Sequence, residues 1–112
     1  MTRLPIIAVT ALVAALALAL PALAATPTYK GTVGPGFTIK LATKPTKAGK
    51  IKLVVSDKSD QHDFHLTGPG VNVKTGVGQT GTTTFTLTLK KGTYKFVCDP
   101  HASFMKGSFK VS

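Results

Sequence analysis

After its first 24 residues, this 112-residue sequence predicts an all-β fold, a Greek-key β-sandwich of about seven strands. Three observations predict this fold class. From Thr28 onward, apolar and polar residues alternate in short runs, as they do in half-buried strands. Gly, Pro and Asn turns separate these runs. No later stretch combines helical spacing of apolar residues with capping residues. The length suits a single domain.

The predicted strands follow one another in order along the chain. Alternation defines seven of them, at residues 28–33, 37–41, 51–55, 62–66, 85–89, 94–98 and 108–111. Turn-forming residues separate them, at residues 34–36, 44–49, 56–61, 67–70 and 90–92. Residues 71–81 predict a loop with at most one short strand. The entry Gly92-Thr93-Tyr94 is compatible with a tyrosine corner, and equally with Tyr94 as an ordinary core aromatic.

Residues 1–24 have the layout of a secretory signal peptide. Arg3 gives a positive start, an apolar run spans residues 4–20, and Ala22-Leu23-Ala24 supplies a small-x-small ending. The alternative is an uncleaved membrane anchor, because the run just reaches the lower length limit of about 17 residues for a span. The ending favours cleavage after Ala24. We therefore expect residues 25–112 to form one periplasmic or secreted domain without stable membrane insertion.

The charge balance is strongly basic. The sequence has 14 Lys and Arg residues against 4 Asp and Glu, and Arg3 is its only arginine, so the domain carries lysines alone. Such a surface attracts acidic partners in a salt-dependent way. Export and the lack of Arg argue against nucleic acid. We expect the scattered lysines to form mainly a solvated surface that also steers an acidic partner.

Three side chains that can bind a metal lie within eight residues, between two predicted strands. They are Cys98, His101 and Met105, and Cys98 is the only cysteine. Exported proteins that rely on disulfides carry an even number of cysteines, so this one is buried and inert, paired to another chain, or bound to a metal. A lone buried Cys usually acts as a small hydrophobe, and a lone Met usually fills a core. The combined spacing Cys-x2-His-x3-Met predicts a metal site instead.

The two remaining histidines differ in strand parity. His62 shares the parity of the apolar Phe64 and Leu66, so we expect it to face the core, whereas His65 should point outward. An inward His62 at one strand end can then meet Cys98 at the end of a neighbouring strand.

Two imidazoles, a thiolate and a thioether predict copper as the metal. Soft sulfur donors favour Cu(I), imidazole serves both oxidation states, and a His2Cys site with a distant Met is the blue-copper arrangement. Zinc is the main rival, but a thioether is a poor fourth ligand for zinc.

At these residues the sequence resembles the cupredoxins, small blue copper proteins such as plastocyanin, amicyanin and pseudoazurin. The resemblance extends from Thr28 to Ser112, and it is carried by the segments 92–101 and 62–66. It implies a single copper ion that is bound by His62, Cys98, His101 and Met105.

Two local departures from the family pattern stand out. Three residues separate His101 from Met105, whereas amicyanin-like loops have two and plastocyanin-like loops four. Asp63 stands where the family usually has an Asn that ties the two ligand segments together. An ionised Asp accepts hydrogen bonds but cannot donate them. The acidic docking patch of plant plastocyanins has no counterpart in this Lys-rich chain.

The resemblance implies electron transfer. We expect His101 to provide the electron route, with Pro100, Ala102 and Phe104 as an apolar docking patch and the lysines steering a redox partner that has an acidic docking surface. A second interpretation is copper scavenging or delivery by the same ligands. A third is a metal-free module that binds polyanions, which leaves the ligand cluster unexplained.

An enzyme is not expected, and neither is an oligomer. Cys98 could act as a nucleophile with a histidine base, but only Asp63 and Asp99 are near enough to orient that base. The sequence has no Glu, so paired-carboxylate hydrolysis has few candidates. We expect a monomer.

Overall fold

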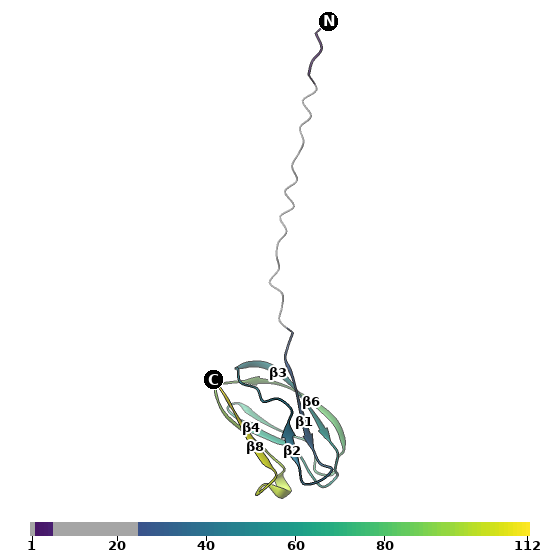
Figure 1. The fold of residues 1–112 in the computed structure, drawn as a ribbon, viewed down its shortest axis with the longest axis vertical. Coiled ribbons are helices and arrows are strands. Elements are labelled where there is room, and N and C mark those ends of the chain that lie inside the picture. Colours follow the sequence, from purple (N-terminus) through teal and green to yellow (C-terminus); the bar gives the residue numbers. More distant parts are fainter. Residues whose placement is uncertain (1, 6–24) are drawn as a thin grey trace.

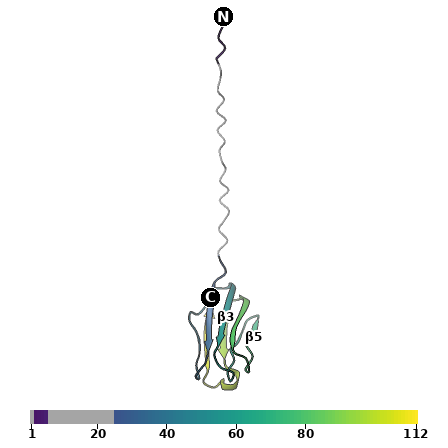
Figure 2. The same cartoon turned by 90° about the vertical axis from the view of Figure 1, so that its right-hand side faces the viewer.

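Two four-stranded β-sheets pack face to face in the computed structural model, which describes residues 2–5 and 25–112 (Figures 1 and 2). The predicted all-β sandwich is confirmed. Its strands are β1 (Thr28–Val33), β2 (Ile39–Leu41), β3 (Gly49–Asp57), β4 (His65–Gly68), β5 (Val71–Lys74), β6 (Gly81–Leu89), β7 (Gly92–Val97) and β8 (Lys106–Val111), and η1 (Asp99–His101) is a single 3-10 turn.

The proposed signal peptide lies outside the described residues, apart from residues 2–5. Among the helices of the described part, none has the length and apolar character needed to cross a membrane.

The first sheet has the strand order β2-β1-β3-β6, and the second has the order β5-β4-β7-β8. In the first sheet β1 pairs with β3 in parallel, and β3 pairs with β6 in antiparallel fashion along its whole length, from Gly49↔Leu89 to Asp57↔Gly81. All pairs in the second sheet are antiparallel. Because strands of both sheets run between the same two ends, the connecting loops gather into two groups.

We call these groups the site end and the far end. The site end holds the loops 34–38, 58–64, 75–80 and 98–105, and the far end holds the loop 42–48, the turns 69–70 and 90–91, and Ser112. Contacts tie the far end together: the Ser112 N–H donates to the Thr46 carbonyl at 3.0 Å. Figure 1 shows the C-terminus and the start of β1 at one end of the sandwich, with η1 at the other.

The core lies between the sheets, and the fully buried apolar residues of the described chain fall within residues 33–111. Its buried members are Val33, Ile51, Leu53, Val55, Phe64, Leu66, Val71, Leu87, Leu89, Tyr94, Phe96, Cys98, Met105, Phe109 and Val111. Two stacked aromatic pairs run through it, Phe64 on Phe96 with ring centroids 5.5 Å apart and Tyr94 on Phe109 at 5.1 Å. Every strand pairing and every buried apolar residue of the described chain lies within residues 25–112, so the described fold is contained in this segment.

Two glycines make room for these aromatic rings. A Cβ on Gly68 would collide with the Tyr94 ring, and a Cβ on Gly107 would collide with the Phe96 ring. The rings therefore lie directly on the backbone of the neighbouring strand, Tyr94 on β4 and Phe96 on β8.

Tyr94 forms the tyrosine corner. Its hydroxyl accepts from the Lys90 N–H at 2.8 Å and lies 3.0 Å from the Pro69 carbonyl, to which it donates. The side chain is also fully buried, so both interpretations of Tyr94 hold. The hydroxyl thereby links the turn 69–70 to the turn 90–91 at the far end.

The structure differs from the predicted strands at two places near the site. β4 begins at His65 rather than His62, so residues 62–64 belong to a loop, and all three are buried. Phe37 lies outside β2 with 64% of its surface exposed. In both places, contacts with the loop 98–105 determine where the side chains lie, rather than the alternation of side chains along a strand.

Candidate metal centre

The ligand loop between β7 and β8 is closed by its own backbone hydrogen bonds. Cys98 follows directly after β7, and its N–H donates to the Met105 carbonyl at 3.0 Å, just before β8 begins. Inside the loop, η1 turns the chain: the His101 N–H donates to the Cys98 carbonyl at 2.9 Å, and the Met105 N–H to the His101 carbonyl at 2.8 Å. Cys98, His101 and Met105 are thus held on one compact turn.

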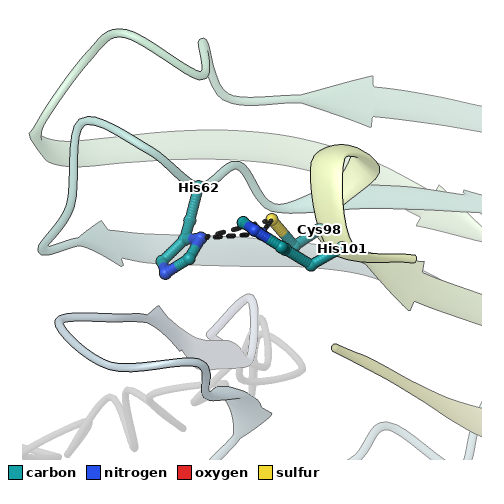
Figure 3. A group of neighbouring side chains, drawn as sticks. All are labelled: His62, Cys98 and His101. Atoms are coloured by element: carbon teal, nitrogen blue, oxygen red, sulfur yellow. Dashed lines mark hydrogen bonds between the residues drawn. The ribbon is translucent and has the colours of Figure 1, made fainter. Parts of the chain in front are cut away.

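His62 reaches this turn from the loop between β3 and β4. Its Nδ1 lies 3.1 Å from the His101 Nδ1 and 3.7 Å from the Cys98 Sγ, which itself lies 3.6 Å from the His101 Nδ1. Figure 3 shows the two imidazole nitrogens converging beside the sulfur. In the described part of the chain, these three residues form the group whose ligand atoms lie close enough together, within 4.8 Å of one another, to hold a metal ion.

This triangle has the size that a first-row metal ion requires. With metal–nitrogen bonds of about 2.0 Å and a metal–sulfur bond of about 2.3 Å, trigonal ligation places nitrogen and sulfur roughly 3.7 Å apart and the two nitrogens roughly 3.5 Å apart. The observed nitrogen–sulfur distances of 3.6 and 3.7 Å match this value. The nitrogens lie 3.1 Å apart and need to separate only slightly. The donor set therefore fits copper.

Burial isolates the sulfur atoms and leaves one imidazole near the surface. Cys98 and Met105 are 0% and 1% exposed and His62 is 3% exposed, whereas His101 is half-buried. Burial raises the pKa of the Cys98 thiol above its usual range, although the Asp63 N–H bonded to it acts in the opposite direction. The metal-free site therefore holds a neutral thiol, and metal binding has to release its proton.

Asp63 connects the two ligand segments as an acceptor. Its carboxylate accepts the Asp99 N–H at 2.6 Å, while its own N–H donates to the Cys98 Sγ at 3.5 Å. Burial, together with a hydrogen bond to the Asp99 side chain, raises the pKa of Asp63 to about 6. The hydrogen bond from Asp63 lowers the pKa of Asp99. Asp63 thus links the segment of His62 to the ligand loop by these two hydrogen bonds, a link that the sequence alone left open.

His65 points outward, as its parity predicted. Its Nδ1 contacts the Asp99 carboxylate at 2.9 Å and its Nε2 contacts the Asn72 side chain at 2.7 Å. Burial opposes protonation of His65, but these two partners outweigh it and raise its pKa. His65 therefore supports Asp99 from outside and takes no part in the triangle.

Phe37 covers both histidines, and the sequence did not point to it. Its ring centroid lies 5.5 Å from that of His62 and 5.1 Å from that of His101. Phe104 joins this group, with its centroid 5.7 Å from Phe37 and 5.6 Å from His101. The available signal was the Gly34-Pro35-Gly36 turn before Phe37, which ends the alternation of β1. Both phenylalanines are mostly exposed, so they form an apolar rim around His101.

The fold and this donor set define a cupredoxin, a small copper protein. A family model described as copper binding proteins, plastocyanin/azurin family, matches residues 37–112. The chain belongs to this family, and its cofactor is a single copper ion. No curated protein sequence matches it.

Solved structures agree on the fold. Reduced rusticyanin is 24% identical with a TM-score of 0.61, over 80% of this chain and 81% of rusticyanin. Rusticyanin from Thiobacillus ferrooxidans is 24% identical with a TM-score of 0.58, over 80% of this chain and 79% of the other. Dithionite-reduced auracyanin from the photosynthetic bacterium Roseiflexus castenholzii is 21% identical with a TM-score of 0.55, over 80% and 99%.

Proposed function

We propose that this protein is an exported blue copper protein that carries single electrons between redox partners. In this proposal His62, Cys98, His101 and Met105 hold the ion. Residues 1–24 are removed on export, and residues 25–112 act as a monomer in the periplasm or outside the cell. The protein is a carrier rather than an enzyme.

The observation that carries this proposal is the triangle of converging donor atoms from His62, Cys98 and His101, with His101 as its half-exposed corner. Bound copper would supply one-electron chemistry by cycling between Cu(II) and Cu(I). The chain's own residues keep the donors in place: three lie on a hydrogen-bonded turn, and the fourth is attached to it through Asp63. A donor set held by these hydrogen bonds needs little rearrangement when the charge of a bound ion changes.

His101 offers the path to the surface. It is the only member of the triangle that is not fully buried, and Phe37 and Phe104 surround it with exposed apolar area. A partner protein that covers this rim would exclude water and approach the imidazole closely. We propose this rim as the docking surface.

Visible absorption during titration of residues 25–112 with Cu(II) tests the proposal. We expect an intense thiolate-to-copper band that saturates at one equivalent and is lost in Cys98→Ser. The control is His65→Gln, which changes the neighbouring outward histidine and should keep the band. A colourless protein that binds only Cu(I) would favour copper scavenging or delivery, and absence of binding in both states would refute a copper site.

Exchange of His101 for Ala tests the electron path. We expect a folded sandwich whose electron exchange with a small redox mediator is slow, because the surface imidazole is gone. Circular dichroism checks the fold, and stopped-flow absorption measures the exchange. An unchanged exchange rate would remove His101 from the path.

A further inference from the structure

Positive charge is unevenly distributed between the two ends of the sandwich. All four acidic residues, Asp57, Asp60, Asp63 and Asp99, lie in the half that contains the metal site. Four lysines lie in the same half and balance them: Lys40, Lys58, Lys74 and Lys106. The net positive charge of the domain therefore belongs to the remaining lysines, which lie in the middle of the strands and at the far end.

The far end carries the densest group of these lysines. Its members are Lys44 and Lys47 in the loop before β3, Lys50 near the start of β3, Lys90 and Lys91 in the turn after β6, and Lys110 near the end of β8. All are exposed. The loops that carry them are tied to one another through Ser112 and Thr46, and through Tyr94, Pro69 and Lys90. Even with a terminal carboxylate on Ser112, this end keeps a strong positive excess.

These lysines are poorly placed to guide a redox partner to His101. β6 spans nine residues between the two ends, which corresponds to about 27 Å at the usual rise of a strand. An acidic protein attracted to the far end would sit that far from the proposed site, and electron transfer slows steeply with distance. The far end therefore suits a partner that does not exchange electrons.

The N-terminal segment leaves the domain at this same end. β1 starts there, and the Lys52 N–H donates to the Pro27 carbonyl at 2.9 Å, which fixes the chain just after residue 25. The preceding apolar run at residues 4–20 belongs to the proposed signal peptide, and such a segment is directed to a membrane. While that run is attached, the lysine end is the part of the domain nearest the bilayer. After cleavage, the new α-amine of Ala25 adds to the positive charge there.

We propose that the far end is a docking surface for an anionic phospholipid bilayer. Lys44, Lys47, Lys50, Lys90, Lys91 and Lys110 contact the lipid headgroups, and the domain is held with its metal end directed away from the membrane. Lysines near an anionic bilayer each strengthen binding, and the effect fades within a Debye length, about 10 Å at 0.1 M salt. The exposed aromatic rim is left free for a protein partner.

Vesicle sedimentation of residues 25–112 tests the binding. We expect the domain to bind phosphatidylcholine vesicles that contain phosphatidylglycerol and not to bind vesicles of pure phosphatidylcholine. High salt should release it from the anionic vesicles. The variant Lys44→Gln, Lys47→Gln, Lys90→Gln, Lys91→Gln should lose roughly five-fold in partition coefficient for each lysine removed. The matched control Lys40→Gln, Lys58→Gln, Lys74→Gln, Lys106→Gln removes the same charge from the site half, and should lose less than about five-fold in total.

Equal losses in the two variants would overturn the proposal, because net charge and not the far end would then govern binding. Failure to bind the anionic vesicles, combined with tight binding of polyglutamate, would overturn it in favour of an acidic protein.

Orientation on the vesicle gives an independent test. The sequence has no tryptophan, so a single introduced Trp reports its own surroundings. Brominated lipids should quench the fluorescence of Thr46→Trp at the far end and leave Phe104→Trp at the site end unquenched. The reverse pattern would overturn the proposal and show that the aromatic rim, rather than the lysines, meets the bilayer.

Discussion

Asp63 is a buried carboxyl whose ionisation opposes folding of the metal-free protein. Only 1% of its surface is exposed, and burial is the main reason that its pKa rises to about 6 from 3.8. Because the folded-state pKa lies above the unfolded one, the protonated Asp63 carboxyl contributes to the free energy of unfolding, and this contribution is fully present below pH 3.8. It is lost as the pH rises towards 6. At neutral pH the folded state therefore retains a charge in an unfavourable environment.

The variant Asp63→Asn should remove this effect. An asparagine keeps an oxygen that accepts the Asp99 N–H, and its amide can donate to the Asp99 side chain as the protonated carboxyl does. We expect the metal-free variant to gain about 1–3 kcal/mol in free energy of unfolding above pH 6 and little below pH 4. Urea denaturation at both pH values measures the difference. A gain of equal size at both would show that charge is not the cause.

Phe37 acts on the site from outside the ligand set. Its ring contacts both histidines although 64% of its surface is exposed. The variant Phe37→Ala should lower the free energy of unfolding by less than about 1 kcal/mol. It should nevertheless accelerate removal of copper by a chelator, because water and chelator gain access to His101.

Absorbance during chelator competition measures this rate. Val77→Ala, which shortens another exposed apolar side chain, is the matched control and should behave like the parent protein. Equal rates in the parent protein and Phe37→Ala would show that the ring does not shield the site.

Among the elements, β7 and β8 accommodate an aromatic ring where one side chain is missing. Gly107 on β8 faces the Phe96 ring on β7, with no room for a Cβ. The variant Gly107→Ala should therefore destabilise the metal-free domain by about 1–3 kcal/mol through overpacking. Gly78→Ala is the control, because nothing lies within 4 Å of a Cβ there. Urea denaturation should show a large loss for the first variant and almost none for the second.

Period-two alternation carried most of the fold prediction, and its failures occur where tertiary contacts compete with it. It located β3, β6, β7 and β8, because one face of each packs on the core, although β6 begins at Gly81, four residues before the predicted start. It gave the right outcome for His62 and His65, but for an incomplete reason, since His62 lies in a loop. It assigned Phe37 to a strand because the residue shares the parity of Ile39.

The site shows the same division between local and long-range information. The spacing of Cys98, His101 and Met105 is local and was visible in the sequence. The hydrogen bonds of Asp63 and the aromatic cover by Phe37 depend on segments that meet only after the sheets pack. The sequence offers only indirect signs of them, namely Asp63 at the position of the family's Asn and the Gly34-Pro35-Gly36 turn before Phe37. The assignment of the four ligands to copper stays a prediction.

At the scale of the whole molecule, the separation of charge between the two ends should affect electron exchange between two copies of the protein. A protein with a strong net positive charge ordinarily repels its own copies, and salt relieves that repulsion. If copies exchange electrons through their metal ends, which are nearly balanced in charge, the repulsion they meet is small. We expect the electron self-exchange rate to rise less than roughly ten-fold between low and high salt. NMR line broadening in mixtures of both oxidation states measures it, and a much steeper rise would show that the whole net charge acts at the contact.

The ligand loop also has a consequence for the unfolded chain. Three of the four proposed ligands lie within residues 98–105, whereas His62 is 36 residues away from Cys98. Denaturation separates His62 from the others but leaves those three neighbours in sequence, so the unfolded chain still offers copper a partial ligand set. A ligand that binds both states stabilises the folded one only by the difference between its two affinities. Copper therefore protects this domain against unfolding by less than its affinity for the folded site implies.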